Sequence, residues 1–503
     1  MKKICYLMTL LAVVLLASCE SKKPSANLVP DDAAVVFRID LMQSADKLGI
    51  SGGNSGLASR VKDIVSDLGL NRAQQKKIEQ VLDDPTSTGI DLTDPLYFFL
   101  AGNIERNPDG GLVGTLASES DFEELLNTLA EDQLDKVEKR NGVSFCGDDD
   151  FCIIFADGWF YLGSNHDTDE TIAQLKERAE GKGSLAASKA FQTMDSKKGL
   201  VQMLVMGKRL ADIRDFRKAI NALPEGLDLA DVSWVSDLIV EKGETMFTCE
   251  NVALSGEWEE YIASTLKALG TIDKSQAKYI SDRGFSAFAN IDTDALARWI
   301  EKIAQAGGAS RNDIKEVKQV CKALSGTAAF DIYGFSTGGP LFTAYIGTKD
   351  NTIVDMIKGL AGDEELEETG NNAYRLPVAY DYNWDDYSRV PSRWGSLGFK
   401  SGQTYFAMEE DEVFRTPENK YPTADLKGKG IYMRFNFEFL NSIAEELWGS
   451  GAEIADEVAN VFDYAEYYVE EEGAGVLRLV NKNKRKTIFD IISDEVKKFG
   501  DDF

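Results

Sequence analysis

Two segments match the Gly-x-Ser-x-Gly pattern that surrounds the nucleophile of many serine hydrolases. They are Gly49-Ile-Ser-Gly-Gly53 and Gly334-Phe-Ser-Thr-Gly338. A nucleophile elbow needs a strand before it, a helix after it and a histidine later in the chain. The first match follows a predicted helix, the second lies in a predicted hairpin turn, and the single histidine, His166, precedes the second match. We therefore expect no serine nucleophile, a solvated loop position for His166, and a protein that is not an enzyme.

Carboxylates are abundant but carry little information, because 84 acidic residues make close pairs inevitable. Acidic clusters at 148–150, 409–412 and 470–472 lack the ligand spacing and the glycine of a calcium loop. One histidine argues against a His-rich metal site. We expect no metal centre and no cofactor, and loose calcium binding stays open.

Four cysteines lie beyond residue 19. Cys146 and Cys152 flank the acidic turn 147–150, and a cross-strand disulfide could form there in an oxidising compartment. Cys249 and Cys321 follow apolar patterns and are expected to be core thiols.

An aromatic-rich segment at 380–394 lengthens a hairpin whose counterpart in the first half of the chain is only 147–150. Aromatic faces stack on sugars and carboxylates accept sugar hydroxyls, but the same composition suits a protein contact. The segment predicts a ligand- or partner-binding site formed by Tyr380, Tyr382, Trp384, Asp385, Asp386, Tyr387, Arg389 and Trp394. The alternative is that these aromatic rings pack onto their own sheet.

The N-terminus has the features of a bacterial lipoprotein signal. Lys2 and Lys3 precede an apolar stretch at 4–16, which ends in Leu16-Ala-Ser-Cys19. We expect a signal peptide at 1–18, a lipid on Cys19 that attaches the chain to a membrane, and a polar tether at 19–28. Glu20 is followed by two lysines and not by an acidic run. That favours an outer-membrane lipoprotein on the periplasmic face over one on the cell surface.

The elements that would position these residues repeat along the chain. Strand–helix pairs are predicted at 35–48, 200–213, 287–300 and 431–447, and each is followed by two strands and a helix. Extra antiparallel hairpin groups at 143–162 and 374–408 occupy corresponding places. The pattern predicts an α+β fold of two tandem duplicated halves, 29–275 and 276–503. Each half has β-α-β-β-α units and antiparallel sheets covered by helices.

Two stretches identify a family resemblance: Val29-Pro-Asp-Asp-Ala-Ala-Val-Val-Phe-Arg-Ile-Asp40 and Asp84-Pro-Thr-Ser-Thr-Gly-Ile-Asp-Leu-Thr-Asp-Pro-Leu-Tyr-Phe-Phe99. Together with the lipoprotein signal that ends at Cys19, they resemble Bacteroidetes lipoproteins of domain-of-unknown-function family 4836. The resemblance covers essentially the whole mature chain. It implies an envelope location and supplies no catalytic residue.

A formal charge of -29 with 55 basic residues makes nucleic acid a poor partner. The one basic run, 482–486, is expected to be a solvated turn. We expect a lipid-anchored envelope protein that acts as a binding or assembly component, with an envelope protein or a glycan as partner. The alternative is a glycan-capturing or glycan-processing outer-membrane lipoprotein.

Overall fold

The computed structural model describes most of the chain in two compact units. The described residues are 25–48, 71–129, 136–147, 151–164, 167–214, 223, 226–290, 292–306, 310–336, 339–361, 366–383, 388–418, 421–447, 452–492 and 494. Unit 1 comprises Met1–Lys218, Asp228–Ser255 and Arg485–Phe503, and unit 2 comprises Ala219–Leu227 and Gly256–Lys484. The boundary between two duplicated halves, which the sequence places between residues 275 and 276, stays a prediction.

Unit 1 contains an antiparallel sheet in which neighbouring described strands follow the order β4-β5-β6-β7-β3-β2-β1-β8-β9-β10. The strands are β1 (Val35–Ile39), β2 (Leu96–Asn103), β3 (Asn107–Thr115), β4 (Glu138–Arg140), β5 (Val143–Gly147), β6 (Phe151–Ala156), β7 (Trp159–Ser164), β8 (Val201–Met206), β9 (Val232–Glu241) and β10 (Glu244–Ala253).

Unit 2 contains an antiparallel sheet whose described strands follow the order β14-β15-β16-β17-β13-β12-β11-β18-β19-β20. The strands are β11 (Phe285–Asn290), β12 (Leu324–Ser336), β13 (Gly339–Thr348), β14 (Glu367–Gly370), β15 (Ala373–Asn383), β16 (Ser388–Lys400), β17 (Gln403–Ala407), β18 (Ile431–Asn436), β19 (Phe462–Val469) and β20 (Gly475–Asn481).

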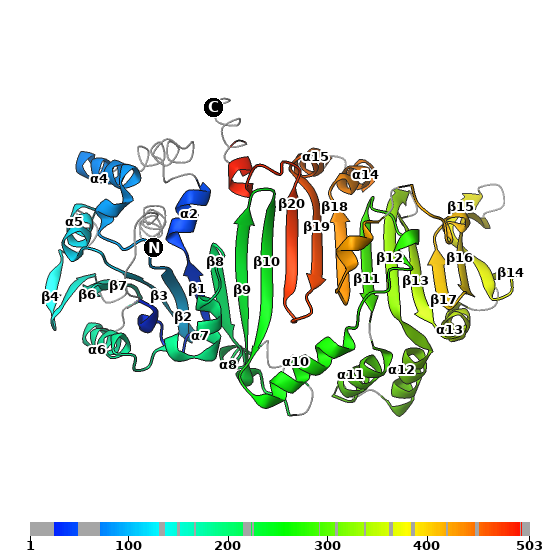
Figure 1. Cartoon of the computed structure of the whole chain (residues 1–503), viewed down its shortest axis with the longest axis horizontal. Helices are drawn as coiled ribbons and strands as arrows, with labels where there is room; N and C mark the ends of the chain where they lie inside the picture. Colours follow the sequence, from blue (N-terminus) through cyan, green and yellow to red (C-terminus); the bar gives the residue numbers. More distant parts are fainter. Residues whose placement is uncertain are drawn as a thin grey trace. The chain divides into compact units, whose positions relative to one another are not determined.

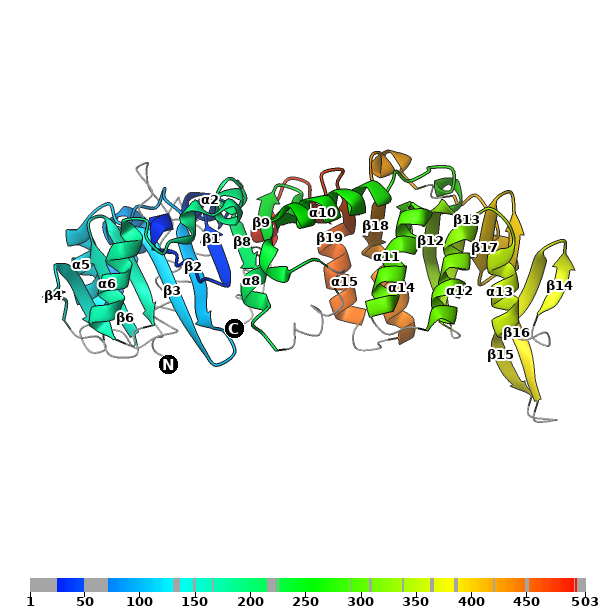
Figure 2. The same ribbon diagram turned by 90° about the horizontal axis from the view of Figure 1, so that it is seen from below.

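Helices connect and cover these strands (Figures 1 and 2). Unit 1 has η1 (Ser25–Leu28), α2 (Leu41–Leu48), α4 (Arg72–Asp83), η3 (Pro85–Thr88), α5 (Glu119–Leu129), α6 (Thr168–Ala179), η4 (Leu185–Ala187), α7 (Lys189–Asp195), α8 (Gly207–Leu210) and η5 (Leu229–Asp231). Unit 2 has α10 (Gly256–Ala268), η6 (Ala277–Tyr279), α11 (Thr293–Ala306), α12 (Arg311–Ala323), α13 (Thr352–Ala361), η7 (Glu410–Glu412), η8 (Thr423–Leu426), α14 (Glu438–Leu447) and α15 (Ala452–Val461).

Two apolar cores lie on opposite faces of the β6–β7 hairpin in unit 1. Ile154 belongs to the core that α6 covers through Ile172 and Leu175. The next residue, Ile153, belongs to the core that α5 covers through Phe122. Successive strand side chains point to opposite faces, so a strand buried on both faces needs apolar residues in sequence. Figure 1 shows α5 and α6 on the two sides of these strands.

The predicted α+β class is confirmed, since helices cover large antiparallel sheets in both units. None of the described helices is both long and apolar enough to cross a membrane. The aromatic segment at 380–394 is strand in the part that the structure describes. β15 continues to Asn383 and β16 begins at Ser388, because the alternation around Tyr380 and Tyr382 favours extended backbone.

Candidate functional site

A cavity of about 570 Å³ lies within unit 1, between α6 and the strands that α6 covers. This volume is in the range that holds a small-molecule ligand. The turn before β1, the strands β2, β3 and β7, and α6 all contribute to it. Its lining residues are Pro30, Asp31, Asp32, Phe99, Ala101, Asp109, Tyr161, Ser164, Asp167, Glu170, Thr171, Gln174, Leu175 and Arg178.

Two aromatic rings form the floor of the cavity. Phe99 and Tyr161 stack with ring centroids 6.4 Å apart. They are only 2% and 5% exposed. Gly111 makes this packing possible, because a Cβ there would lie 2.3 Å from the Phe99 ring. The Tyr161 hydroxyl donates to the Ser164 carbonyl oxygen at 2.9 Å, and burial raises the pKa of Tyr161. The floor is therefore rigid and apolar.

One side of α6 forms the wall of the cavity. Asp167 starts this helix, because its carboxylate accepts hydrogen bonds from the backbone N–H groups of Asp169 and Glu170 at 3.0 and 3.1 Å. Glu170, Gln174 and Arg178 follow at intervals of four residues and therefore lie on one side of the helix.

These three wall side chains form a hydrogen-bonded chain. The Gln174 amide donates to Glu170 at 3.1 Å, and the Arg178 guanidinium donates to Gln174 at 3.2 Å. The wall therefore presents a hydrogen-bonded row of polar groups to the cavity.

The lining is strongly acidic. Among the described lining residues, Arg178 is the one basic residue, and the carboxylates belong to Asp31, Asp32, Asp109, Asp167 and Glu170. Burial lowers the pKa of Arg178, and the negative charges of nearby aspartates, led by Asp32, oppose that shift. Asp32 also accepts from the Gly102 N–H at 3.3 Å and lies 3.8 Å from Arg209. Burial therefore outweighs the neighbouring carboxylates at Arg178, and the pKa of its guanidinium is lowered on balance.

None of the described residues that line the cavity is a histidine, a cysteine or a lysine. Its one serine, Ser164, hydrogen-bonds through its hydroxyl to the backbone of Gly110. Among the described residues, no group of three or more His, Cys, Asp or Glu side chains is placed to hold a metal ion.

Each unit also contains a row of buried polar side chains that crosses several strands. In unit 1, Arg38 on β1 lies between Tyr97 on β2 and Gln202 on β8, and Gln202 faces Asp237 on β9. The Arg38 guanidinium donates to Gln202 at 2.6 Å, and Gln202 donates to Asp237 at 2.7 Å. Asp195 at the end of α7 accepts from Arg38 at 3.1 Å and from Tyr97 at 2.8 Å.

The corresponding row of unit 2 runs from Asp331 through Ser286, Arg434 and Glu466 to Arg478. Arg434 lies 3.0 Å from Asp282 and 3.3 Å from Asp425, and its guanidinium stacks 3.6 Å above the Tyr464 ring. Glu466 accepts from Arg478 at 2.9 Å and from the Tyr432 hydroxyl. The partners of both rows lie within the same unit, so we interpret the rows as hydrogen bonds and ion pairs that stabilise each unit.

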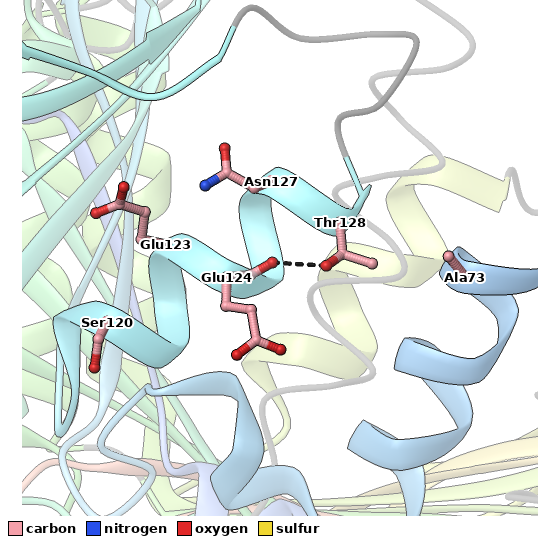
Figure 3. A pocket seen from close by; sticks show the side chains of 6 residues that line it. All are labelled: Ala73, Ser120, Glu123, Glu124, Asn127 and Thr128. Carbon is pink, nitrogen blue, oxygen red and sulfur yellow. Dashed lines mark hydrogen bonds between the residues drawn. The ribbon is translucent and has the colours of Figure 1, made fainter.

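A second hollow of about 470 Å³ lies between α4 and α5. Figure 3 shows its side chains projecting from the helices, with the Thr128 hydroxyl donating to the Glu124 carbonyl oxygen at 2.8 Å. Lys77 pairs with Glu124 at 2.8 Å. The lining residues are Ala73, Ser120, Glu123, Glu124, Asn127 and Thr128. None of them is an aromatic or a large apolar residue, so this hollow is a weaker candidate than the unit 1 cavity.

The predicted aromatic site lies on the β15–β16 hairpin of unit 2, and none of its residues belongs to the lining of the unit 1 cavity. Tyr380 is 46% exposed and pairs with Pro391, while Tyr382 pairs with Arg389. The Arg375 guanidinium stacks 4.4 Å from the Trp394 ring. Trp384, Asp385, Asp386 and Tyr387 lie outside the described residues, as do Cys19 and His166.

The disulfide that the sequence allows between Cys146 and Cys152 is not formed, and both residues are buried thiols. Cys146 pairs with Ile153, whereas Cys152 pairs with Gly147. Residues that face each other in an antiparallel pair share a face, and their neighbours point the other way. The one-residue offset therefore puts the two thiols on opposite faces of the sheet.

None of the cavity residues was predicted as a site residue from the sequence. A usable signal was the polar spacing along one side of 168–179, where Glu170, Gln174 and Arg178 recur every four residues. That spacing alone also describes any solvated helix face. Only the fold shows that this face meets a hollow.

The family model for "Domain of unknown function (DUF4836)" matches residues 25–419. No curated protein matches the chain. Two solved structures, "Structure of crystal form IV of TP0453" and "Structure of crystal form I of TP0453", are 11% and 12% identical to it, with TM-scores of 0.28 and 0.27. The matches cover 46% and 52% of this chain and 81% and 89% of those chains. Likeness at this level supports no conclusion about this chain.

Proposed function

We propose, from the premise that this chain belongs to the DUF4836 family, that it is a lipid-anchored binding component of the cell envelope and not an enzyme. The observation that carries the proposal is the unit 1 cavity. Its volume suits a ligand, hydrogen bonds link the polar side chains of its wall, and its described lining residues include no nucleophile with an adjacent base.

The anchor in this proposal is a lipid on Cys19 after removal of residues 1–18. The charged n-region, the apolar stretch and the small residues before the cysteine support it. The location would be the outer membrane, with the periplasmic face favoured. Labelling cells with a palmitate analogue should mark the wild-type protein and not Cys19→Ala. Equal labelling of both proteins would contradict the anchor.

Cross-linking in intact cells tests the binding role. A photo-reactive residue is placed at Thr171 on the cavity wall, and the matched control carries it at Thr193 on α7, which is helical and half-buried as well. We expect light to join the Thr171 derivative, and not the Thr193 derivative, to an envelope component. Identical products from both positions, or none from either, would contradict a binding role for the cavity.

Glycan capture is the second candidate, and the observation that favours it is the β15–β16 hairpin. Tyr380 exposes 46% of its surface there. A sugar that binds the hairpin should raise the melting temperature of wild-type protein and should do so less for Tyr380→Ser. A sugar effect that is unchanged in Tyr380→Ser would place the sugar elsewhere.

We also propose that the two units arose by tandem duplication. The shared strand order supports this, since each strand of unit 1 has a counterpart of the same rank in unit 2. The buried polar rows support it as well, because they cross corresponding strands: β2, β1, β8 and β9 in unit 1, and β12, β11, β18 and β19 in unit 2.

A further inference from the structure

We propose that a short linker holds one end of unit 1 against the lipid bilayer, with the cavity toward the opposite end. This inference rests on the proposed function, because it takes from it the lipid on Cys19. The end concerned, which we call the linker end, is where η1 begins at Ser25. The surface that lies against it is the headgroup layer of the membrane that holds the lipid.

The length of the linker is the first argument. Five residues, 20–24, separate Cys19 from Ser25. A fully extended chain spans at most about 3.6 Å per residue, so the Cα atoms of Cys19 and Ser25 lie no more than about 22 Å apart. A folded unit of this size has a radius of roughly 20–25 Å. The linker is therefore shorter than unit 1 is wide, and unit 1 cannot turn its far side to the bilayer.

The attachment of η1 is the second argument, because a loosely held η1 would lengthen the linker. Ser25, Leu28 and Val29 are 0% exposed. The hydroxyl oxygens of Ser25 and Thr115 lie 3.3 Å apart. The backbone N–H of Leu185 donates to the Val29 carbonyl oxygen at 2.9 Å. Releasing η1 would expose two buried apolar side chains and break these contacts, so the folded chain begins at Ser25.

The position of Ser25 in the sheet defines the linker end. Thr115, which Ser25 contacts, is the last residue of β3 and pairs with Trp159, the first residue of β7. In the turn between β6 and β7, the carbonyl oxygen of Gly158 accepts from the Leu116 N–H at 2.8 Å. The linker end is therefore the end of the sheet where β3 stops and β7 starts.

The opposite end of the sheet carries the β2–β3 turn and the cavity. Arg106 in that turn precedes Thr115 by nine residues. At about 3.3 Å per strand residue, the two lie about 30 Å apart along β3. The cavity residue Asp109 pairs with Ala101 near the turn, and the cavity residue Ser164 is the last residue of β7. The cavity thus lies away from the bilayer, and a partner reaches it from the aqueous compartment.

The orientation of unit 1 follows from the same lengths. If the unit lay on its side, its radius of roughly 20–25 Å would lift its buried interior about as far as the linker reaches. The linker would then be almost fully extended, at a cost in conformational entropy. With the linker end toward the bilayer, Ser25 comes close to the headgroups and the linker keeps its conformational freedom.

Fluorescence quenching on vesicles tests the inference. The signal-free chain, 19–503, is coupled through Cys19 to a maleimide-bearing lipid, with Cys249→Ser in every variant because that thiol is partly exposed. A fluorescent residue replaces Ala117 at the linker end or, as the matched control, Arg106 in the β2–β3 turn. Both positions are exposed and lie outside regular helix and strand. The vesicles are phosphatidylcholine with a nitroxide quencher on a fraction of the headgroups.

We expect quenching at Ala117 to exceed quenching at Arg106 by about threefold or more, because about 30 Å of strand separates the two ends. Equal quenching, or stronger quenching at Arg106, would overturn the inference. Weak quenching at both positions would mean that no lipid lies against the linker end, and it would overturn the inference as well.

A longer linker separates the effect of linker length from adhesion of the protein surface to lipid. About twenty glycine and serine residues are inserted between Lys23 and Pro24, which raises the mean reach to about 25 Å and the full reach to more than about 80 Å. We expect the difference between Ala117 and Arg106 to fall below about 1.5-fold. A difference that stays unchanged would overturn the linker as the cause of the orientation.

Chemical coupling makes the failure of this inference distinguishable from failure of the proposed function. An absence of palmitate labelling at Cys19 in cells would refute the natural anchor, even if the coupled protein showed the expected quenching. Normal labelling in cells with equal quenching at Ala117 and Arg106 would leave the anchor intact and refute the orientation.

Discussion

Asp331 provides the sharpest test of the energetics of unit 2. It lies on β12 with only 3% of its surface exposed. It accepts from the Ser281 N–H at 2.9 Å, and its other oxygen lies 3.2 Å from the Ser281 hydroxyl. Burial raises the pKa of this carboxyl to about 7, the hydrogen bonds from Ser281 oppose the shift, and the negative charges of Glu412 and Asp282 add to it. The folded protein therefore holds this proton across most of the acidic range.

The sign of the pH effect follows from proton linkage. The unfolded chain loses the Asp331 proton near its ordinary pKa of 3.8, whereas the folded protein keeps it until about pH 7. Between those values the unfolded state binds fewer protons, so the free energy of unfolding falls as pH rises. Each pKa unit corresponds to about 1.4 kcal/mol. Ionisation of Asp331 therefore lowers the free energy of unfolding by about 3 kcal/mol between pH 4.5 and 7.5.

The variant Asp331→Asn should abolish this fall in the free energy of unfolding, because asparagine does not ionise. An asparagine can still accept from the Ser281 N–H and can donate to the Ser281 hydroxyl, so the local hydrogen bonds are kept. Urea unfolding at pH 4.5 and 7.5 measures the effect in the step assigned to unit 2, and the exposed carboxylate variant Asp411→Asn is the control. We expect Asp331→Asn to gain about 3 kcal/mol over wild type as pH rises. Parallel pH profiles for all three proteins would refute the reasoning.

Three further changes test other contacts by urea unfolding. Gln202→Leu removes one acceptor of Arg38 and one donor to Asp237 from a buried row, while Asp195 still accepts from Arg38, and should cost about 1–3 kcal/mol; a cost below about 0.5 kcal/mol would contradict this reasoning. Gly114→Ala puts a Cβ 2.4 Å from an aromatic ring and should cost about 1–3 kcal/mol, whereas Gly110→Ala, whose Cβ would meet nothing nearer than 3.8 Å, should cost less. Tyr380→Ser should change stability by less than about 0.5 kcal/mol, because the side chain is 46% exposed; a large loss would mean that the ring packs on its own sheet.

The element types could be predicted from the sequence because they depend on local spacing. Two apolar runs joined by the Asp157-Gly158 turn predict the β6–β7 hairpin, and that hairpin forms with Asp157 and Gly158 at positive φ. The α6 helix begins at Thr168, close to the predicted start near Glu170. In each case the signal and the structure lie within the same few residues.

Register and long-range proximity could not be predicted in this way. The disulfide expectation depended on whether Cys146 faces Cys152, and a shift of one residue decides that question. The cavity depends on bringing residues 30–32 next to β3 and α6, which lie far along the chain. No local pattern encodes those distances.

Polar residues inside strands show why candidate sites are harder to predict from the sequence than helices and strands are. In sequence, Arg38, Gln202 and Glu466 look like the solvent-facing half of an alternating strand, yet they are at most 8% exposed. Helices and loops cover them, and each finds an internal partner. Charge in a strand therefore predicts neither exposure nor function. What distinguishes the unit 1 cavity is that its carboxylates line a hollow from several elements at once, and that property appears only after folding.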